Sequence, residues 1–334
     1  MLNKLIGAAL ALFSVPALAF PLGVNIGCGT CGSGNVYGGT GYTYGPAADI
    51  DNVYAVGVRE LRIAVKAPRL VTRPGGSVDP NVNAKLIPLI DHALAKGMTV
   101  VLDVHDYGTW FGNVITKSDV PDVVDMWNKA FAKYKGNSRF LPSFMNEPYK
   151  AGTSIWDVTQ VWISDMRAAG WHGPLIVPGQ GYSSLQAFTN YGSKLLGLHD
   201  PDSRLIFDGH SYFDSNNSGT HSDVLGLTAA DLSNEAGFKQ KVHDNFYAKL
   251  GKTLAWARKY NQKILVGETA LPNTEVAKAA TPIIVSLYDE NADVIEHLTW
   301  WTYTSGMPLP KYMFGLQNTS KQPSEILQRI SAAK

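Results

Sequence analysis

The sequence predicts a single (β/α)8 barrel, and three observations support this prediction. Eight short apolar runs alternate with stretches of helical period, which is typical of β–α units around a parallel sheet. Eight such units in a chain of 334 residues match the size of a (β/α)8 barrel. No linker, composition break or short repeat divides residues 20–334, so we expect them to form one domain.

The eight apolar runs are the predicted strands of the barrel. In chain order they are Leu22–Ile26, Val58–Val65, Thr99–Val104, Phe140–Met145, Pro174–Val177, Leu205–Phe207, Lys263–Val266 and His297–Trp301. Short, nearly continuous apolar runs favour strands that are buried on both faces of a parallel sheet.

The segment after the second run shows the helical period most clearly. Asp79 is a suitable N-cap and Pro80 suits the first turn of a helix. Apolar residues then recur on one face from Val82 to Leu94. Gly97 is expected to end this helix.

An open, doubly wound sheet is the alternative to a barrel. That fold usually carries a Gly-x-Gly-x-x-Gly turn between its first strand and first helix. Here the glycines after Ile26 lie in the long segment Cys28–Gly45, which is rich in Gly, Thr and Tyr and leads into no clear helix. The barrel therefore remains the favoured fold.

The composition excludes several classes of protein. With 45% apolar and 17% charged residues, the chain is too apolar to be a disordered segment. Its 29 basic and 28 acidic residues give a formal charge of +1, and no basic run is long enough to follow a phosphate backbone. We therefore expect no nucleic acid partner. The 8 Trp and 15 Tyr suit a protein that binds neutral ligands such as sugars.

The first nineteen residues have the pattern of a signal peptide. Lys4 precedes the apolar stretch Leu5–Ala19, which closes on the small residues Ala17 and Ala19 that a signal peptidase accepts. The alternative is a buried N-terminal helix. No later window approaches the 18 to 20 apolar residues of a membrane span. We expect residues 1–19 to be removed and residues 20–334 to be secreted, either to the medium or to the periplasm, with no membrane attachment.

The two cysteines, Cys28 and Cys31, form a Cys-x-x-Cys pair in a glycine-rich segment. Export exposes them to an oxidising environment, which favours a local disulfide. A structural zinc ion would need two further ligands that no second pair provides. Redox-active pairs usually begin a helix, which these surroundings do not favour.

Polar side chains stand near the carboxyl ends of the predicted strands, where a barrel of this kind carries its active site. They are Arg62, His105, Asn146, Glu147, His210, Tyr212, Glu268 and Trp301. A single histidine or tryptophan in such a place is more often structural than functional. Carboxylates, however, avoid burial unless they are paired, and Glu147 and Glu268 follow the fourth and seventh strands.

Two glutamates facing each other across a barrel mouth suit the cleavage of a glycosidic bond. One carboxyl group gives a proton to the departing oxygen, and the other, ionised, attacks the anomeric carbon. The fixed charge of Arg62 would keep the attacking group ionised. The residues alone thus predict a glycosidase, with Glu147 and Glu268 as its catalytic pair.

Several blocks in chain order resemble glycoside hydrolase family five, the cellulase family of retaining (β/α)8 glycosidases. They are Gly23–Ile26, Leu61–Ile63, Val100–Gly108, Met145–Pro148, His210–Ser215, Ser218–His221, Gly267–Glu268 and Thr299–Trp301. The resemblance extends over nearly all of residues 20–334 and is strongest to the endo-β-1,4-glucanases of the family.

The resemblance implies a role for each site residue and implies neither a metal nor an organic cofactor. Glu147 would be the acid/base and Glu268 the nucleophile, while Arg62 and Tyr212 contact the nucleophile, Asn146 binds the sugar 2-hydroxyl, His105 and His210 position the substrate, and Trp301 stacks under the sugar. The implied partner is a polysaccharide, and we expect a monomer.

Three departures from the family pattern bear on the substrate. Asp106 stands where the family usually has Asn, and Thr109 where related glucanases have Arg. The loop Thr304–Pro310 lacks the two further tryptophans of those relatives. We expect a cellulose-like β-1,4-glucan as substrate, with mannan, mixed-linkage glucan and bacterial exopolysaccharide as alternatives. Two competing hypotheses of different classes are a sugar-binding barrel without turnover and an aldolase using Lys66.

Overall fold

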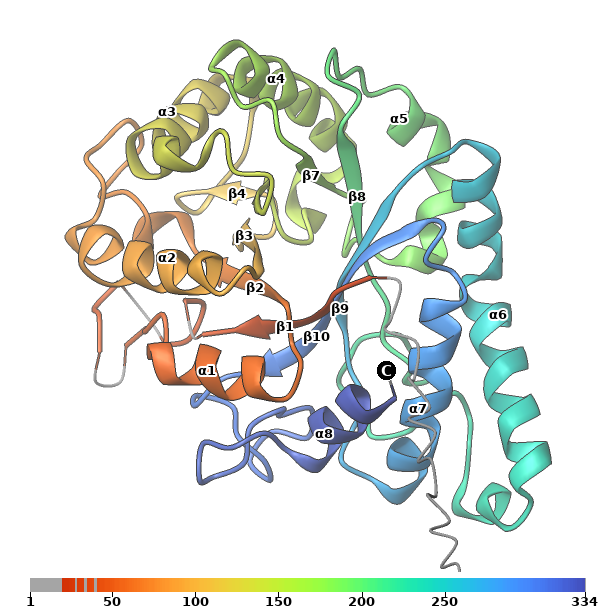
Figure 1. Cartoon of the computed structure of the whole chain (residues 1–334). Coiled ribbons are helices and arrows are strands. Elements are labelled where there is room, and N and C mark those ends of the chain that lie inside the picture. The colour runs from red at the N-terminus through yellow and green to blue at the C-terminus, as the bar shows by residue number, and fades with distance from the viewer. Residues whose placement is uncertain (1–19, 28, 33–34, 39–40, 334) are drawn as a thin grey trace, which may run out of the picture.

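The computed structural model describes residues 20–27, 29–32, 35–38 and 41–333. Within them, eight parallel strands close into a barrel with the order β1-β10-β9-β8-β7-β6-β3-β2, and helices surround it (Figure 1). The predicted (β/α)8 barrel is confirmed. The predicted signal peptide, residues 1–19, and Cys28 lie outside the described residues, so the signal peptide and the disulfide between Cys28 and Cys31 stay predictions.

Each of the eight predicted runs overlaps a strand of the barrel. The strands are β1 (Leu22–Ile26), β2 (Glu60–Val65), β3 (Thr99–Val104), β6 (Phe140–Ser143), β7 (Leu175–Pro178), β8 (Leu205–His210), β9 (Ile264–Thr269) and β10 (Ile295–Tyr303). Four strands run further than their apolar runs: β7 by one residue, β8 and β9 by three residues each, and β10 by two residues at each end. β8 and β9 stay hydrogen-bonded to one another as far as the pair His210 and Glu268. These two predicted site residues therefore lie on the barrel strands themselves.

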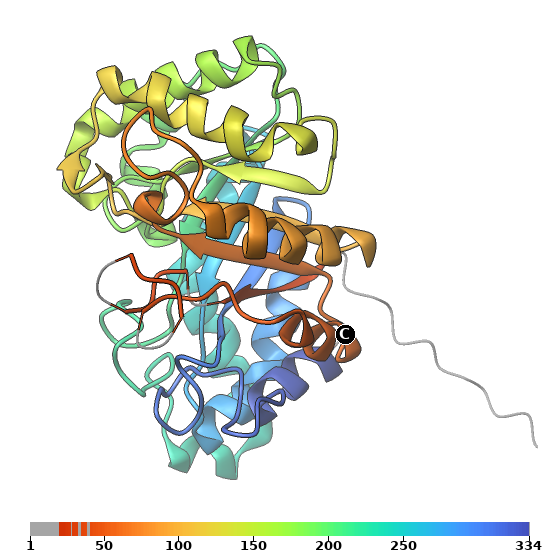
Figure 2. The ribbon, with the colours of Figure 1, turned by 90° about the vertical axis from the view of Figure 1, so that its left-hand side faces the viewer.

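The helices lie on the outside of the barrel. They are α1 (Ala47–Ala55), α2 (Ile87–Ala95), α3 (Val120–Phe131), α4 (Ile155–Ala168), α5 (Gly192–Leu196), α6 (Glu235–Lys259), α7 (Glu275–Asp289) and α8 (Glu325–Ala332). Figure 2 shows α8 next to α1, and the Asn52 side chain of α1 donates to the Lys321 carbonyl at 3.1 Å. The last helix thus meets the first and completes the outer layer.

Short helical turns join several of these elements. They are the 3-10 turns Ala67–Arg69, Lys117–Asp119, Ala132–Tyr134, Tyr149–Ser154, Leu185–Asn190 and Ala229–Ser233, and the π-helical turn Val82–Leu86. The π turn opens the helix predicted after Asp79, whose carboxylate accepts from the Asn81 N–H at 2.8 Å. Gly97 ends that helix with a φ of +76°, as predicted.

The interior of the barrel contains a small apolar cluster. Val101, Leu141, Ile176, Ile206 and Leu265 come from five consecutive strands and pack together, apart from the larger core under the helices. Because they belong to five different strands, they fill the barrel beneath its mouth.

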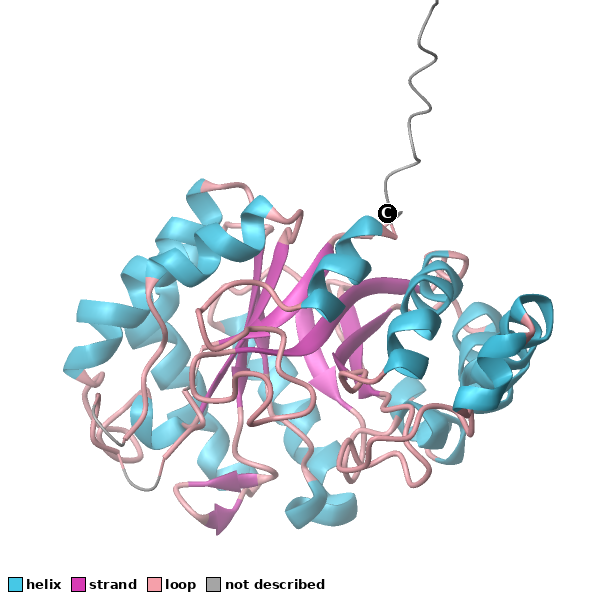
Figure 3. Cartoon of the chain, turned by 90° about the horizontal axis from the view of Figure 1, so that it is seen from below, coloured by secondary structure: helices cyan, strands magenta, loops and turns pink. Residues whose placement is uncertain are grey.

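A hairpin follows β3 at the same end of the barrel as the strand carboxyl ends. Its strands are β4 (Thr109–Trp110) and β5 (Asn113–Val114), which pair antiparallel. Figure 3 shows this hairpin at the end of the molecule opposite the C-terminal helix. No helix among the described residues is long and apolar enough to cross a membrane.

Candidate active site

Arg62 is the centre of a buried network at the carboxyl ends of the strands. Its side chain is fully buried. Nη1 donates to Glu268 Oε1 and to Asn25 Oδ1, both at 2.9 Å, and Nη2 donates to Asn146 Oδ1 at 2.6 Å. A single guanidinium thus joins side chains from β1, from β9 and from the turn after β6.

Two buried aspartates complete the surroundings of Arg62. Asp103 lies 3.2 Å and Asp208 3.7 Å from Nη2. Burial alone would lower the pKa of Arg62, but Asp103, Glu268 and Asp208 outweigh burial and raise it, so the guanidinium keeps its charge. Burial also acts to raise the pKa of Asp103, and the charges of Arg62 and His105 reverse this and lower it.

Both carboxylate oxygens of Glu268 are hydrogen-bonded. Arg62 donates to Oε1, and the Tyr212 hydroxyl donates to Oε2 at 2.7 Å. Burial raises the pKa of Glu268, but the charges of His210 and Arg62 outweigh that effect, and the net pKa lies below the usual value. Glu268 is therefore ionised at neutral pH and fixed from two sides.

Glu147 is the more accessible of the two glutamates. Its side chain is 17% exposed, against 7% for Glu268. It follows β6 in a tight turn in which Glu147 itself has a φ of +37°, a backbone conformation that is uncommon outside glycine. The Asn146 N–H donates to the Val104 carbonyl at 2.8 Å and ties this turn to β3.

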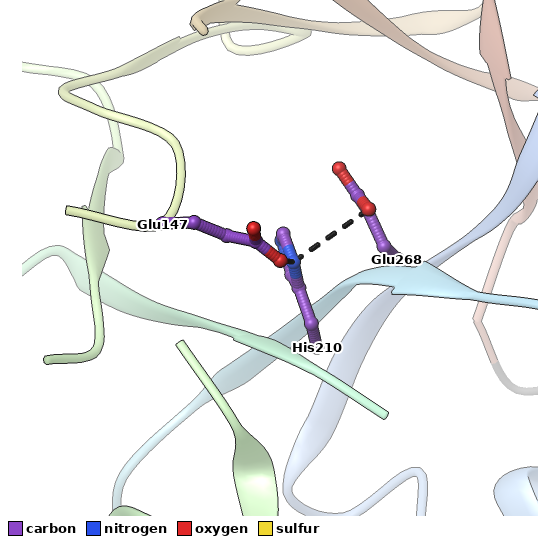
Figure 4. A group of neighbouring side chains, drawn as sticks. All are labelled: Glu147, His210 and Glu268. Carbon is purple, nitrogen blue, oxygen red and sulfur yellow. Dashed lines mark hydrogen bonds and ion pairs between the residues drawn. The ribbon is translucent and has the colours of Figure 1, made fainter. Parts of the chain in front are cut away.

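The imidazole of His210 lies between the two glutamates (Figure 4). Nδ1 is 2.7 Å from Glu147 Oε1 and 3.7 Å from Glu268 Oε2. Burial lowers the pKa of His210, but Glu268 and Asp208 outweigh burial and raise it well above the usual value. His210 therefore carries a positive charge at neutral pH, and Nδ1 donates to Glu147.

His105 and Trp301 form a second layer beside this network. His105 Nδ1 is 2.8 Å from Asp103 Oδ2, and Nε2 is 3.1 Å from the Tyr107 hydroxyl. The imidazole stacks on Trp301 with ring centroids 6.0 Å apart. Trp301 is half-buried and its indole N–H donates to the Tyr312 hydroxyl at 3.1 Å. One face of Trp301 is thus covered by His105.

All eight predicted site residues therefore meet at one end of the barrel. A cavity of about 530 Å³ opens beside Glu147, His210 and Tyr212 and is bordered by Tyr182 and by Asn216–Ser218. A larger groove of about 930 Å³ runs between α6 and α7 but contains none of the predicted site residues. The chemistry thus belongs to the smaller cavity.

Comparison with known families shows which family this chain belongs to. Residues 27–306 match the model of the cellulase family, glycosyl hydrolase family 5. The chain belongs to this family. It is therefore a glycoside hydrolase, as the sequence predicts from Glu147 and Glu268.

Individual relatives agree with this family assignment. Endo-β-1,4-glucanase A of Emericella nidulans is 28% identical over 97% of this chain and 96% of its own length. The manganese dependent endoglucanase Eg5A of Phanerodontia chrysosporium is 32% identical over 67% of this chain and 61% of its own length.

Solved structures share the fold. XacCel5A in complex with cellopentaose superimposes with a TM-score of 0.80 over 95% of this chain and 99% of its own, at 23% identity. Cel5A from Hypocrea jecorina superimposes with a TM-score of 0.75 over 93% of this chain and 98% of its own, at 22% identity.

Sequence reasoning missed several side chains of this family 5 site. They are Asn25, Asp103, Tyr149, Tyr182, Asp208 and Tyr312. Asp103 and Asp208 had a usable signal, because each is a charged residue inside an otherwise apolar strand. The tyrosines lie in loops, where the sequence offers no comparable pattern.

Tyr149 and Tyr182 form an exposed aromatic surface near Glu147. Their rings stack with centroids 4.6 Å apart, and the two residues are 40% and 60% exposed. On the other side of the site, Tyr312 and Phe314 pack around Trp301 and Tyr212. The loop after β10 has no aromatic residue as far as Pro310, but Tyr312 and Phe314, which follow it, contribute two aromatic rings to the site.

Asp106, at the position where relatives usually have Asn, links two loops. Its Oδ2 accepts from the Ala67 N–H at 2.5 Å, and its carbonyl accepts from the Thr109 hydroxyl at 2.7 Å. Burial raises the pKa of Asp106 to about 6. The carboxylate of Asp106 thus joins the segments that follow β2 and β3.

Glu147, His210 and Glu268 also form the one group of described residues with the spacing of metal ligands, with donor atoms within 4.8 Å of one another. A dication there would meet the protonated imidazole of His210 and the Arg62 guanidinium, 2.9 Å from Glu268. The charges around the group therefore suit acid–base chemistry better than metal binding.

Proposed function

We propose that this glycoside hydrolase is a secreted, retaining endo-β-1,4-glucanase that cleaves cellulose-like chains by double displacement. The observation that carries the proposal is the separation of Glu147 and Glu268, which have one carboxylate oxygen each within 4.8 Å of the other. Retaining glycosidases place the two carboxyl groups about 5 to 5.5 Å apart, whereas inverting enzymes leave room for a water molecule.

In the first step Glu268 attacks the anomeric carbon and Glu147 protonates the departing glycosidic oxygen. The bond to the leaving chain breaks, and an ester forms between the sugar and Glu268. Arg62 and the Tyr212 hydroxyl hold the two oxygens of Glu268 and keep it ionised. His210 donates to Oε1 of Glu147, which leaves Oε2 to carry the transferred proton.

In the second step Glu147, now ionised, removes a proton from water, and the water oxygen displaces Glu268 from the sugar. The sugar keeps the configuration it had in the chain. Asn146 contributes to both steps. Its Oδ1 accepts from Arg62, while its Nδ2 is buried and has no partner among the described residues. This free donor suits the proposed contact with the sugar 2-hydroxyl.

The substrate assignment is supported by relatives and by aromatic surfaces on two sides of the site. The relatives are named endo-β-1,4-glucanases, and XacCel5A is described in complex with cellopentaose. Trp301 on one side and Tyr149 and Tyr182 on the other offer flat surfaces for sugar rings.

The catalytic assignment is tested with Glu268→Gln and Glu147→Gln. We expect E268Q to fold as the wild type does and to release no new reducing ends from carboxymethyl cellulose. E147Q should lose most activity on polysaccharide but retain the first step on an aryl cellobioside, whose leaving group needs little protonation. Substantial turnover by E268Q would remove the nucleophile assignment, and wild-type protein that binds glucan without cleaving it would support a binding protein instead.

The retaining mechanism and the substrate are tested on the wild-type enzyme. Proton NMR during hydrolysis should show the β-anomer first, and initial release of the α-anomer would contradict double displacement. Products should be profiled on carboxymethyl cellulose, mixed-linkage glucan, mannan and bacterial exopolysaccharides. Faster cleavage of any of the last three would show that this polysaccharide is the preferred substrate, with the same proposed mechanism.

Export and the extent of the domain are part of the same proposal. The charge, apolar stretch and cleavage pattern of residues 1–19 support removal of a signal peptide, which leaves one catalytic domain over residues 20–334. The mass of the secreted protein should correspond to a chain beginning at Phe20. Light scattering should give the mass of a monomer.

A further inference from the structure

Two side chains of helix α6 are hydrogen-bonded to the loop that carries Tyr212. Lys249 Nζ donates to the Tyr212 carbonyl and lies 3.5 Å from the Asp214 carbonyl. One helical turn earlier, Asn245 Nδ2 donates to the Leu225 carbonyl at 2.7 Å. The helix therefore contacts both ends of the loop 212–225.

Within the loop, most hydrogen bonds are local. The Leu225 N–H donates to the Phe213 carbonyl at 2.7 Å and closes the loop at its base. The Asp214 carboxylate accepts from the Thr220 N–H at 3.0 Å and from the Ser218 hydroxyl at 3.2 Å. These bonds give the loop its shape, but they do not fix its position on the barrel.

The loop has open space on two sides. Asn216–Ser218 border the 530 Å³ cavity that also contains Glu147. Behind the loop, a second cavity of about 480 Å³ is bordered by Asp214, Asn217 and Lys249. Phe213 and Val224, at the base of the loop, are buried in the core, whereas the tip has open space on both sides. The hydrogen bonds to α6 therefore add to this packing at the base of the loop.

Lys249 is unusual for a lysine on an outer helix because its amine is mostly buried. Burial lowers its pKa to about 8, against the weaker opposing charges of Asp214 and Asp223. No ion pair of Lys249 occurs among the described residues, and its Nζ lies 5.4 Å from the centre of the Phe213 ring. Buried amines are costly unless hydrogen-bonded, so the two carbonyls account for its placement.

The contacts of α6 that hold this loop also hold Tyr212 against Glu268. The Tyr212 hydroxyl is 2.7 Å from Glu268 Oε2. The backbone of Gly219 packs on the Tyr212 ring so closely that a Cβ there would lie 2.6 Å from Cδ1. Displacing the loop would therefore displace Tyr212 from the carboxylate.

We propose that Lys249, assisted by Asn245, is a positioning residue that fixes Tyr212 in its hydrogen bond with Glu268. This inference rests on the proposed function of Glu268 as the nucleophile. Lys249 touches neither substrate nor Glu268; it acts through the Tyr212 carbonyl. Other charged or titratable groups near Glu268 come from other elements: Arg62 from β2, His105 and Tyr107 after β3, Glu147 after β6, His210 from β8 and Tyr312 after β10.

The test is Lys249→Met, which keeps the length of the side chain and removes the donor. We expect kcat/KM on an aryl cellobioside to fall about ten-fold or more, because a displacement of about 1 Å at a catalytic group can reduce the rate about 100-fold. The acid limb of the pH profile should move to higher pH, since Glu268 loses a donor that lowers its pKa. Lys249→Arg, which keeps a donor, should restore most of the rate.

The matched control is Lys252→Met, because Lys252 is on the same helix and borders the same cavity but is exposed. K252M should behave as the wild type. A loss of activity in K249M with an unmoved acid limb, proportional to a loss of folded protein in thermal unfolding, would show a merely structural role and overturn the proposal.

A double-mutant cycle separates action through Tyr212 from independent effects. If Lys249 acts through Tyr212, then K249M/Y212F should be no slower than Y212F alone and should have the same acid limb. Multiplied losses in the double variant would overturn the proposal. E268Q in the same assay tests the proposed function separately, because its failure to abolish turnover would remove the nucleophile whatever K249M does.

Discussion

His210 carries a positive charge between the two glutamates and interacts electrostatically with both. Its Nδ1 lies between Glu147 and Glu268, and its Nε2 lies 3.6 Å from Asp208 Oδ2. Burial alone would favour the neutral imidazole, but the neighbouring carboxylates favour the charged form. In the proposed mechanism, this positive charge reduces the repulsion between the two carboxylates whenever both are ionised.

Replacing Asp208 with Asn should lower the pKa of His210 toward the usual value of about 6.5, because one of the charges that raise it is lost. In the wild type His210 keeps its proton until the pH rises through its raised pKa, so in D208N the proton leaves at lower pH. Ring NMR should show this shift, and the basic limb of the kcat profile should move the same way.

Asp157→Asn is the control for that experiment, because Asp157 is exposed on α4 and is paired with Lys117 rather than with a residue of the site. It should leave the titration of His210 unchanged. An unchanged titration in D208N as well would show that Asp208 does not support the imidazolium.

Replacing Tyr212 with Phe removes one donor to Glu268 and leaves Arg62 in place. Hydrogen bonds to charged groups contribute about 1.5 to 3 kcal/mol, so we expect kcat/KM to fall roughly 10- to 100-fold. The lowered pKa of Glu268 should rise, so activity on the acid side should be lost at a higher pH than in the wild type. An unmoved acid limb would contradict the role of this hydroxyl.

For single residues, the sequence predicts membership of the site better at strand ends than inside strands or in distant loops. Glu147 and Glu268 could be found because a carboxylate after an apolar run needs an explanation. Asp103 and Asp208 need the same explanation, but their partner Arg62 is apparent only when the strands are brought together. Tyr312 follows β10 by nine residues, and no local pattern predicts its bond to Trp301.

Among the elements, the strands are predicted well at their starts and less well at their ends. Apolar runs report which side chains are buried, whereas strand ends depend on backbone pairing. β8 and β9 continue through polar residues because their backbones pair as far as His210 and Glu268. β6 stops at Ser143 although the apolar run reaches Met145, because the chain then turns to place Asn146 and Glu147.

The ends of β2 and β10 away from the site carry a second buried ion pair. His297 Nδ1 is 2.6 Å from Glu60 Oε2, and both residues are buried. Burial raises the pKa of Glu60. For His297, burial lowers the pKa, but Glu60 outweighs burial and raises it. The folded protein therefore binds protons here more tightly than the unfolded chain does.

His297→Leu should reduce the free energy of unfolding by about 3 to 5 kcal/mol, because it leaves Glu60 buried without its partner. The double variant E60L/H297L should recover most of this loss. In the wild type the contribution of His297 is complete below pH about 6.5 and is lost as the pH rises through its raised folded pKa. Denaturant unfolding at several pH values measures both effects, and an H297L variant as stable as the wild type would refute them.

At the scale of the whole molecule, the near-neutral net charge indicates that electrostatic attraction does not speed the binding of substrate. With a formal charge of +1, the protein creates little long-range attraction, and the proposed substrate is neutral. We expect kcat/KM on cello-oligosaccharides to change less than about two-fold between low and high ionic strength. A steep fall with added salt would contradict this expectation.

The whole barrel is predictable because eight alternating units leave few other ways to bury eight apolar runs. The shape of the cleft cannot be predicted in this way, because the loops that border it have no periodic pattern of apolar residues. Residues 212–225 keep their shape through the Asp214 carboxylate and contacts with α6, and the contacts with α6 join residues far apart in the sequence.

The Arg62 network also suggests how this enzyme can be redesigned. The guanidinium joins side chains from β1, β3, β8 and β9 and from the turn after β6, all below the loops that border the cleft. The distance between the glutamates is thus set by the barrel. Loops above this network other than 212–225, which holds Tyr212 against Glu268, can therefore be exchanged to change substrate preference while the network is kept.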